Sequence, residues 1–553
     1  MKRTLLIILA LVTTNLLSQS STNSKFNSNL DQFQDEKIHL HYNSDFLLSG
    51  ERLYYKLYCQ TVNNQFTPFS KIAYVELLDK ENKSLLKQKI SLTNGNGYGD
   101  IFINTQVKTG TYKLLAYTKW MQNKGNYFTK NIYVINPFAD KIAIDAAEAS
   151  DATTSSKLST STSNSLFSVN QSTFGKREQI TLNINSTAFE TIEGSFSISV
   201  SQKNDLNTPQ ENKVIEIPNK SAQFYIPELR GSLIKGKLSS SSKKISDIKL
   251  SLSISGSNRL PLTAITNSLG EFYFNIENLN NDTVYLSILE EDPEGYLLEL
   301  SNDSETITGV QNFPGITLNQ KVVDAIKKRS LYSQIENAYL TVKKDSILKT
   351  ATESALLNTN KIVYELDEYK RFNTIKETFI EVVEGAGFFK KGETFKLNVT
   401  DTDASETLSY LPSLLIIDGR IVNDHDTFMR YNSRKIKTIS LIRDKYFYGN
   451  AMYQGIILVD SFKKDYFLES NTYQKFTVKP IQPEKIYFFQ EHHENNKRIP
   501  DFRSQLYWNP EVRADQTQIS FFTSDVKGTF EIVAQGFNKE GKLVTVKTDF
   551  TVE

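Results

Sequence analysis

Short runs of alternating apolar and polar residues, each ended by a turn, recur along most of this chain. The run Leu53–Cys59 alternates with period two and follows the turn Ser49-Gly50-Glu51. Similar runs occur at residues 72–78, 85–92 and 112–120, with glycine-containing turns between them. A period of two places successive side chains on opposite faces of a strand. Several short strands with frequent turns predict two packed antiparallel sheets, a β-sandwich.

The N-terminal end has the features of a secretory signal peptide. Met1-Lys2-Arg3 is followed by the apolar run Leu5–Val12 and then by small residues such as Ser18 and Ser20. The run is short and is interrupted by Thr13-Thr14-Asn15, which disfavours the alternative of an N-terminal membrane anchor. The sequence predicts a signal peptide over residues 1–20 and an exported protein with no transmembrane segment of its own. No cysteine lies near the cleavage site, so a lipid anchor is not expected.

The composition excludes some classes of function. The chain has 64 lysines and arginines against 63 aspartates and glutamates, a balance that argues against nucleic acid as a partner. Cys59 is the only cysteine, so no internal disulfide holds the exported domains, which must be stable through packing alone. A chain of 553 residues is too long for one hydrophobic core, which indicates several domains.

Changes in pattern divide the chain into segments. Residues 147–165 are rich in serine, threonine and alanine, a composition typical of a linker. From residue 319 to 344 the apolar residues recur at helical spacing, and a second helix is predicted over Leu366–Val383. Strand patterns return at residues 413–417, 436–442 and 455–459. We expect a signal peptide at 1–20, a sandwich at 36–138, a linker at 139–165, a second sandwich unit at 166–229, a third sandwich at 230–310, a helical segment with an α/β domain at 319–461, and a final sandwich at 462–553.

Two segments resemble known β-sandwich domains. The run Gly110–Trp120, together with Asn136-Pro137-Phe138, resembles the macroglobulin-type domain of alpha-2-macroglobulin-like proteins of Bacteroidota. Residues 262–274, with Asn267 and Gly270 at turn positions, resemble a carboxypeptidase regulatory-like domain. Both resemblances imply sandwich folds, and the second implies no peptidase activity.

A third segment is similar to the plug domain of TonB-dependent outer-membrane receptors. The similarity is carried by Leu414–Ile417 before the turn Asp418-Gly419, and by Tyr448-Gly449 before the strand Gly455–Val459. Arg420 stands where such domains often have a small apolar residue. In a receptor the plug fills a barrel of the same chain. Only about 90 residues follow that strand here, whereas 22 strands need more than about 200. We expect a plug-like domain without a barrel of its own.

The last segment completes a series of resemblances. From Pro500-Asp501-Phe502 to Gly528 it resembles the terminal sandwich of the same large Bacteroidota proteins, in which these four domain types occur in this order. The predicted fold class is mostly β, with several Ig-like or macroglobulin-type β-sandwiches in a row plus one small α/β plug-like domain.

No motif predicts catalysis or a cofactor. His39 and His41 are two residues apart on a predicted strand and would share one face, where a metal would need a third ligand that is not evident nearby. Glu491-His492-His493-Glu494 is typical of a solvated loop, and no His-Glu-x-x-His or Gly-x-Ser-x-Gly motif occurs. Cys59 lacks the Glu-Gln of a macroglobulin thioester and is expected to be a buried small residue. We predict no catalytic, cofactor-binding or metal-binding residues.

These observations favour a non-enzymatic structural or protein-interaction protein. We expect it to be exported and associated with the outer membrane of a Bacteroidota-type cell, in the periplasm or at the cell surface. One alternative is an accessory subunit of an outer-membrane transport or assembly complex, whose plug-like domain docks on a β-barrel protein; the same domain can equally be a mere spacer. The other alternative is a secreted carbohydrate-binding or hydrolase-associated protein, which clustered exposed aromatic residues would favour.

Overall fold

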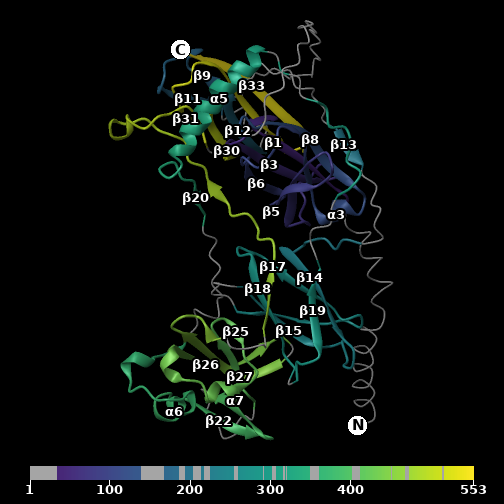
Figure 1. The fold of residues 1–553 in the computed structure, drawn as a ribbon, viewed down its shortest axis with the longest axis vertical. Coiled ribbons are helices and arrows are strands. Elements are labelled where there is room, and N and C mark those ends of the chain that lie inside the picture. The colour runs from purple at the N-terminus through teal and green to yellow at the C-terminus, as the bar shows by residue number, and fades with distance from the viewer. Residues whose placement is uncertain are drawn as a thin grey trace, which may run out of the picture. The chain divides into compact units, whose positions relative to one another are not determined.

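The computed structural model describes most of the chain, in segments. The described residues are 34–138, 167–185, 194–203, 213–216, 224–254, 260–290, 292–301, 307–315, 318, 320–348, 360–400, 411–449, 451–466, 473–513 and 516–553. The chain forms two compact units (Figure 1). Unit 1 comprises the chain up to Leu229, Thr306–Ile347 and Glu484–Glu553, and unit 2 comprises Arg230–Glu305 and Leu348–Pro483. The expected signal peptide at 1–20 and the linker at 139–165 lie outside the described residues.

The N-terminal part of unit 1 is a β-sandwich, as the alternating runs predict. One sheet has the order β1-β3-β6, formed by Glu36–Tyr42, Arg52–Thr61 and Asn96–Phe102. The second has the order β13-β8-β7-β4-β5, formed by Lys213–Glu216, Asn126–Ile135, Gly110–Tyr117, Ile72–Leu78 and Ser84–Ser91; β2 (Phe46–Leu48) pairs with β8 in parallel. Gly95, in the turn between β5 and β6, has a φ of +73°, a conformation that favours glycine.

Strand β3 is buried on both of its faces. The Tyr55 hydroxyl donates to Gln88 on β5 at 2.5 Å, inside the first sandwich. On the opposite face, the Lys56 ammonium donates to Ser195 Oγ at 2.8 Å and the Tyr58 hydroxyl lies 2.8 Å from Ser197 Oγ. Both serines belong to a second sandwich. The outer face of β3 is therefore part of the contact between the two sandwiches of unit 1.

The predicted strand at 112–120 ends earlier than its pattern indicates. Strand β7 stops at Tyr117, and Trp120 lies on the short helix α3 (Lys119–Gln122). The Thr118 hydroxyl accepts the Met121 N–H at 3.2 Å and caps this helix, which explains why the chain leaves the sheet at this point.

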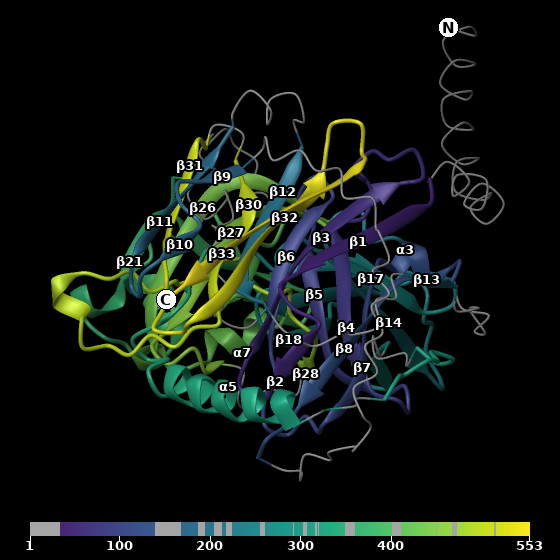
Figure 2. The same cartoon turned by 90° about the horizontal axis from the view of Figure 1, so that it is seen from above.

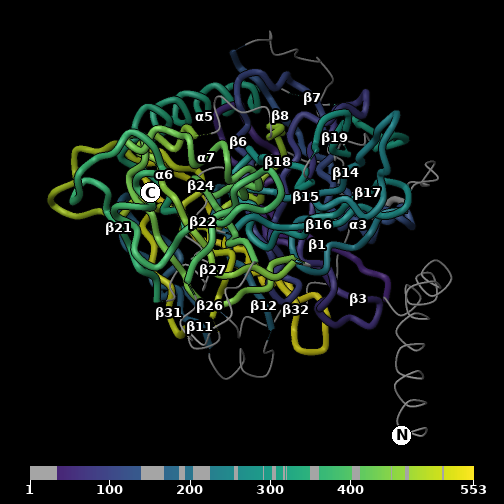
Figure 3. The backbone as a smooth tube through the Cα atoms, turned by 90° about the horizontal axis from the view of Figure 1, so that it is seen from below, coloured from purple at the N-terminus to yellow at the C-terminus, as the bar shows by residue number. Residues whose placement is uncertain are grey.

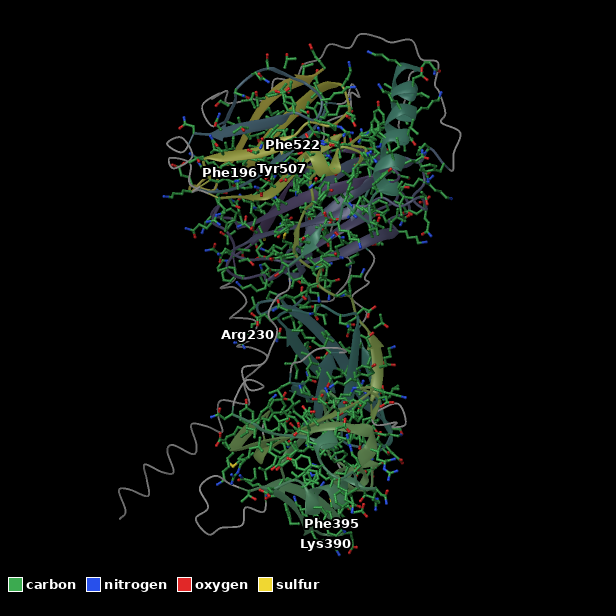
Figure 4. All side chains as sticks on the ribbon, turned by 90° about the vertical axis from the view of Figure 1, so that its left-hand side faces the viewer. Phe196, Arg230, Lys390, Phe395, Tyr507 and Phe522 are labelled. Atoms are coloured by element: carbon green, nitrogen blue, oxygen red, sulfur yellow. The ribbon has the colours of Figure 1, made fainter. Side chains whose placement is uncertain are left out.

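The second sandwich of unit 1 combines strands from two distant parts of the chain. One sheet has the order β10-β33-β32-β12-β30, formed by Thr173–Phe174, Leu543–Val552, Gly528–Phe537, Ser195–Gln202 and Gln505–Val512. The other has the order β31-β11-β9, formed by Gln518–Phe522, Gln179–Ile184 and Phe167–Val169. Figure 4 labels Phe196, Tyr507 and Phe522 in this sandwich.

This sandwich crosses the boundary that the sequence pattern suggests. Strand β12 pairs antiparallel with both β30 and β32. Strands of the expected unit at 166–229 therefore share sheets with strands of the expected sandwich at 462–553. Apolar side chains from both segments, including Ile198, Leu182 and Phe530, form one hydrophobic core. Figure 2 shows β12 beside β30 and β32.

The helix predicted over residues 319–344 is present as α5 (Gln320–Ala338). Val323 and Ile326 are buried against Phe46, Tyr133 and other residues of the first sandwich. Only the first part of the predicted apolar set packs on unit 1, because Leu331, which belongs to the same spacing, is 55% exposed.

Unit 2 contains a sandwich and an α/β module. The sandwich sheets have the orders β17-β14-β19 and β16-β15-β18-β28. Their strands are Glu271–Ile276, Ser232–Ser240 and Tyr296–Leu300, then Leu262–Ile265, Lys249–Ile254, Thr283–Ile288 and Gln474–Thr477. Figure 3 traces β14 to β19 in teal. Because β28 pairs with β18, the α/β module lies between strands of this sandwich in the sequence, together with the unit 1 segment that contains α5.

The α/β module has one five-stranded sheet of order β21-β26-β27-β24-β25. The strands are Ile362–Glu365, Ile436–Tyr448, Ala451–Ser461, Leu414–Ile417 and Arg420–Ile421. Helices α6 (Ile375–Glu381) and α7 (His425–Met429) and the hairpin β22–β23 (Ala386–Lys391 and Thr394–Val399) share a core with one face of the sheet. Lys390 and Phe395 of the hairpin are labelled in Figure 4. The strands predicted at 413–417, 436–442 and 455–459 are all present.

The helix predicted over Leu366–Val383 is interrupted. A 3-10 turn, η2, covers Leu366–Glu368, and α6 begins only at Ile375. Thr374 and Glu377 form a capping box, in which each side chain binds the backbone N–H of the other residue. This pair starts a new helix at Ile375 instead of continuing the first turn.

Four short elements complete the described chain. Strand β20 (Ser346–Ile347) pairs with β29 (Lys485–Ile486), and 3-10 turns occur at Ser433–Lys435 (η3) and Glu494–Asn496 (η5). None of the helices in the described segments is both long enough and apolar enough to cross a bilayer.

Candidate functional site

The two histidines of β1 lie on one face of the strand, as their spacing predicts. His39 Nε2 is 3.0 Å from Gln535 Oε1, and His41 Nδ1 is 2.6 Å from Ser197 Oγ. Both partners belong to the second sandwich, so the histidines join the two sandwiches of unit 1. Across the described residues, no group of three histidine, cysteine, aspartate or glutamate side chains is placed to hold a metal ion.

The His41–Ser197 pair combines an imidazole with a hydroxyl, as an activated nucleophile does, but it is buried away from solvent. His41 is 3% exposed, and Ser197 and Tyr58 are fully buried. Burial, followed by the nearby charges of His39 and Lys56, lowers the pKa of His41 to about 3, so the imidazole is neutral at physiological pH. Because a substrate has no path to a group this deep, the pair serves packing between the sandwiches.

One histidine lies deeper than its sequence context indicates. His493 is exposed and pairs with Glu491, as a solvated loop predicts. The His492 side chain is 8% exposed and its Nε2 lies 2.9 Å from Asp501 Oδ2, so the prediction was wrong for this residue. Burial alone would raise the pKa of Asp501, but the Arg503 guanidinium and hydrogen bonds from Arg503 and His492 hold it well below its usual value.

Cys59 is fully buried, as its position in a strand predicts. Burial raises the pKa of its thiol well above the usual value, which keeps the sulfur protonated and unreactive.

A cleft of about 740 Å³ opens in unit 1 along helix α5. One wall is α5 and the residues that follow it. The opposite walls come from residues 43–54 of the first sandwich and from residues 485–489 and 502–505 near the start of β30. These segments are far apart in sequence, and no motif joins them, so sequence patterns alone give no signal for this site.

Several of the charged side chains in the cleft walls are paired within the protein. Arg329 makes two hydrogen bonds to Glu51, at 2.6 and 2.8 Å. Lys343 binds Glu336 at 2.7 Å, and Arg503 binds the buried Asp501.

Aromatic rings form much of the apolar lining of the cleft. The Tyr332 ring on α5 is stacked on Phe502, with centroids 4.8 Å apart and an interplanar angle of 17°. Tyr54, Phe488 and Phe489 also line the cleft, and Phe488 is 38% exposed. These rings give part of the cleft an apolar lining.

In unit 2, the side chain of Arg420 joins the α/β module to the sandwich. The residue lies directly after the Asp418-Gly419 turn, and its guanidinium is placed over the ring of Tyr285, a residue of the sandwich. Nearby, Asn423 Nδ2 donates to the Leu289 carbonyl at 2.9 Å. A small residue at 420 would leave this junction between module and sandwich unfilled.

The hairpin β26–β27 carries an exposed apolar tip. Phe447 is 70% exposed and faces Met452 across the two strands, which is 39% exposed. On the other face of the hairpin, Tyr446 and Tyr453 pack against a hydrophobic cluster that includes sandwich residues. Because adjacent residues of a strand point to opposite faces, Phe447 points away from this cluster.

Comparison with known proteins finds similarity only among solved structures. No protein-family model and no curated protein matches the chain. Escherichia coli alpha-2-macroglobulin activated by porcine elastase aligns with a TM-score of 0.23 and 7% identity, over 94% of this chain and 44% of that chain. The trypsin-activated form aligns with a TM-score of 0.24 and 7% identity, over 94% and 41%. The Yersinia pseudotuberculosis adhesin InvE aligns with a TM-score of 0.14 and 11% identity, over 48% and 57%.

The chain spans less than half the length of these two macroglobulins. Likeness at such TM-scores and identities carries no argument about family or function. The mostly β character of the chain, with several small sheets, is evident from its own strands.

Proposed function

We propose that this protein is a non-enzymatic interaction protein, exported and associated with the outer membrane of a Bacteroidota-type cell. Its α/β module in unit 2 docks on an outer-membrane β-barrel protein of another chain. The signal-peptide features of residues 1–20 and the order of the four domain resemblances support this proposal.

One observation carries the docking step: the exposed apolar pair Phe447 and Met452 near the end of the β26–β27 hairpin. Phe447 shows the highest exposure among the large apolar residues described, and the partly exposed Met452 opposite it extends the apolar surface that a partner would cover. Its position on a hairpin held by Tyr446 and Tyr453 reduces the entropy that binding would cost.

The module does not need to enter a barrel to dock in this way. One face of its sheet, with Leu414, Ile416 and Ile456, shares a cluster with Leu260 and Leu289 of the unit 2 sandwich. Insertion of the whole module into a lumen would first have to uncover that face. The hairpin tip requires no such rearrangement.

The test is to isolate tagged full-length protein from native membranes after crosslinking and to identify what is retained. We expect an outer-membrane barrel protein with the natural chain and its loss with Phe447→Ser. The matched control is Leu269→Ser, because Leu269 is 63% exposed on a turn of the sandwich in the same unit. Recovery of the barrel protein with both variants, or with neither variant nor the natural chain, would show the proposal to be wrong.

A further inference from the structure

We propose that one end of the α/β module in unit 2 binds a bilayer surface that carries anionic phospholipids. We call it the basic end, and its residues are Lys370, Arg434, Lys435, Lys437, Phe462 and Lys463. It is separate from the docking surface proposed above, because Phe447 lies at the other end of the long hairpin β26–β27 (Figure 1). The binding of lipid therefore does not depend on docking to a barrel protein.

Three segments of the chain meet at the basic end. The first residue of β26 pairs with the last residue of β27, and the Phe462 N–H donates to the Lys435 carbonyl at 3.1 Å. The Arg371 guanidinium donates to the Ile436 carbonyl at 2.7 Å, and its carbon lies 5.5 Å from the centre of the Phe462 ring. These contacts place Lys370 and Arg371 beside the chain that precedes β26 and the chain that follows β27.

Positive charge is in excess at this end. The segments 366–371, 433–437 and 460–465 contain seven lysines and arginines against four aspartates and glutamates. Arg434, Lys437 and Lys463 are exposed and form no ion pair with a described residue. Lys370 lies over the Phe372 ring, 5.9 Å from its centre, and likewise has no carboxylate partner in the described part of the chain.

The carboxylates of these segments do not neutralise the four cations. Asp367 pairs with Arg371, and Asp460 pairs with Lys464. The other two carboxylates form no ion pair with a described residue. The basic end therefore keeps unpaired cations that an anionic surface can bind.

Phe462 gives this charged surface an apolar centre. The residue is 49% exposed. At a bilayer interface an aromatic ring lies among the headgroups, while lysine and arginine extend their apolar stems and hold their charges near the phosphates. The unpaired cations come from three segments that meet at one ring, which fits a layer of many headgroups better than a single small anion.

The position in the sheet argues against a peptide strand as the ligand. Addition of a strand needs an open strand edge. The sheet has the order β21-β26-β27-β24-β25, so β26 and β27, whose ends carry most of the basic end, have a neighbour on each side. An acidic protein that binds without adding a strand is the alternative that the experiment must distinguish.

The test measures the binding of the purified protein to vesicles. The protein begins at Ser21, because the apolar run Leu5–Val12 would itself enter a bilayer. Sucrose-loaded vesicles contain phosphatidylcholine alone or with about 30% phosphatidylglycerol, and bound protein is measured by sedimentation at about 50 mM and about 500 mM NaCl. We expect binding only to the vesicles with phosphatidylglycerol and only at low salt, because high salt screens the attraction.

Two variants locate the binding. Lys437→Gln/Lys463→Gln should weaken it about 25-fold, because each lysine near an anionic surface contributes about fivefold. Phe462→Ser should weaken it about tenfold through the lost apolar contact. The double lysine variant is decisive, because Phe462 also packs against Arg371 and its replacement can disturb the module.

The matched control is Lys390→Gln/Lys391→Gln, which removes the same charge from the exposed end of strand β22 in the same unit. This control should bind vesicles as the natural chain does. Phe447→Ser should also bind them normally, so a failure of the proposed barrel docking would leave the vesicle result unchanged.

The proposal is wrong if the natural chain does not bind vesicles with phosphatidylglycerol. It is also wrong if folded Lys437→Gln/Lys463→Gln binds them no worse than Lys390→Gln/Lys391→Gln does. Capture of the protein by immobilised polyglutamate, without any vesicle binding, would assign the basic end to an acidic protein instead.

Discussion

The guanidinium carbon of Arg420 lies 3.6 Å from the centre of the Tyr285 ring, and 5.5 Å from that of Tyr473. Tyr285 belongs to β18 of the sandwich, and Tyr473 directly precedes β28. The Tyr473 hydroxyl also donates to the Ile421 carbonyl. One side chain of the inserted module is thus held between two aromatic residues of the sandwich that surrounds the insertion.

Replacing this cation should loosen the junction inside unit 2. Arg420→Ala removes a partly desolvated cation–π contact, and we expect a loss of about 2 kcal/mol in the stability of that junction. Amide hydrogen exchange should report it as faster exchange in β24 and β18. The control is Arg430→Ala, because the Arg430 side chain is 72% exposed and pairs only along its own helix. Equal exchange rates in Arg420→Ala and the natural chain would contradict the prediction.

Local sequence patterns predicted the strands well but not their partners. The sequence predicts a strand at residues 72–78, and β4 covers Ile72–Leu78. Alternation cannot state that β12 lies between β30 and β32, because pairing over about three hundred residues depends on which faces complement each other in the folded chain. The same holds for β28, which returns to the sandwich after the whole α/β module.

The candidate cleft could not be predicted from the sequence either, because it too depends on contacts between distant segments. Its walls meet only after α5 packs on the first sandwich and β30 pairs with β12. Arg420, in unit 2, differs because the sequence analysis singled it out, although nothing in the sequence indicated its contact with Tyr285. The serine partners of β3, Ser195 and the fully buried Ser197, had no comparable signal, since both occupy ordinary strand positions in the sequence.

Cutting the chain between the two sandwiches of unit 1 should not separate them. We would insert a site-specific protease sequence after Ser150 and cleave the purified protein. The fragments should elute together in size-exclusion chromatography, because β13 pairs with β8 and the Lys71 N–H donates to the Glu228 carbonyl at 2.8 Å across the cut. Denaturing urea should release them. Separate elution under native conditions would mean that these contacts do not hold the fragments.

The capping box of α6 should contribute measurably to unit 2. Thr374→Ala removes the hydroxyl that accepts the Glu377 N–H at 3.2 Å. We expect a loss of about 1 kcal/mol in the free energy of unfolding of unit 2, measured by denaturant titration with circular dichroism. Thr374→Ser keeps the acceptor and should restore most of the loss. A Thr374→Ser variant as unstable as Thr374→Ala would assign the effect to the lost methyl group instead.

The neutral His41 should make unit 1 sensitive to acid. Its pKa is about 3 in the folded protein, because burial and the charges of His39, Lys56 and Lys547 oppose protonation, and about 6.5 in the unfolded chain. Above pH 6.5 the imidazole is neutral in both states. Below pH 6.5 the unfolded state alone takes up the proton, so stability is lost as the pH falls from 6.5 towards 3, by about 1.4 kcal/mol per pH unit.

The measurement is the unfolding of unit 1 by denaturant at pH 6.5 and pH 5, a window above the range in which ordinary carboxylates titrate. Both tryptophans, Trp120 and Trp508, lie in unit 1, so their fluorescence follows this unit alone. His41→Gln keeps an acceptor for Ser197 but does not titrate. Its loss of stability over this interval should be smaller than that of the natural chain by about 2 kcal/mol. His425→Gln is the matched control, because burial also lowers the pKa of His425 to about 3, but this residue belongs to unit 2. The fluorescence transition of His425→Gln should keep the pH dependence of the natural chain. If the transition of His41→Gln has that same pH dependence, His41 is not the residue whose low pKa reduces the stability of unit 1 in acid.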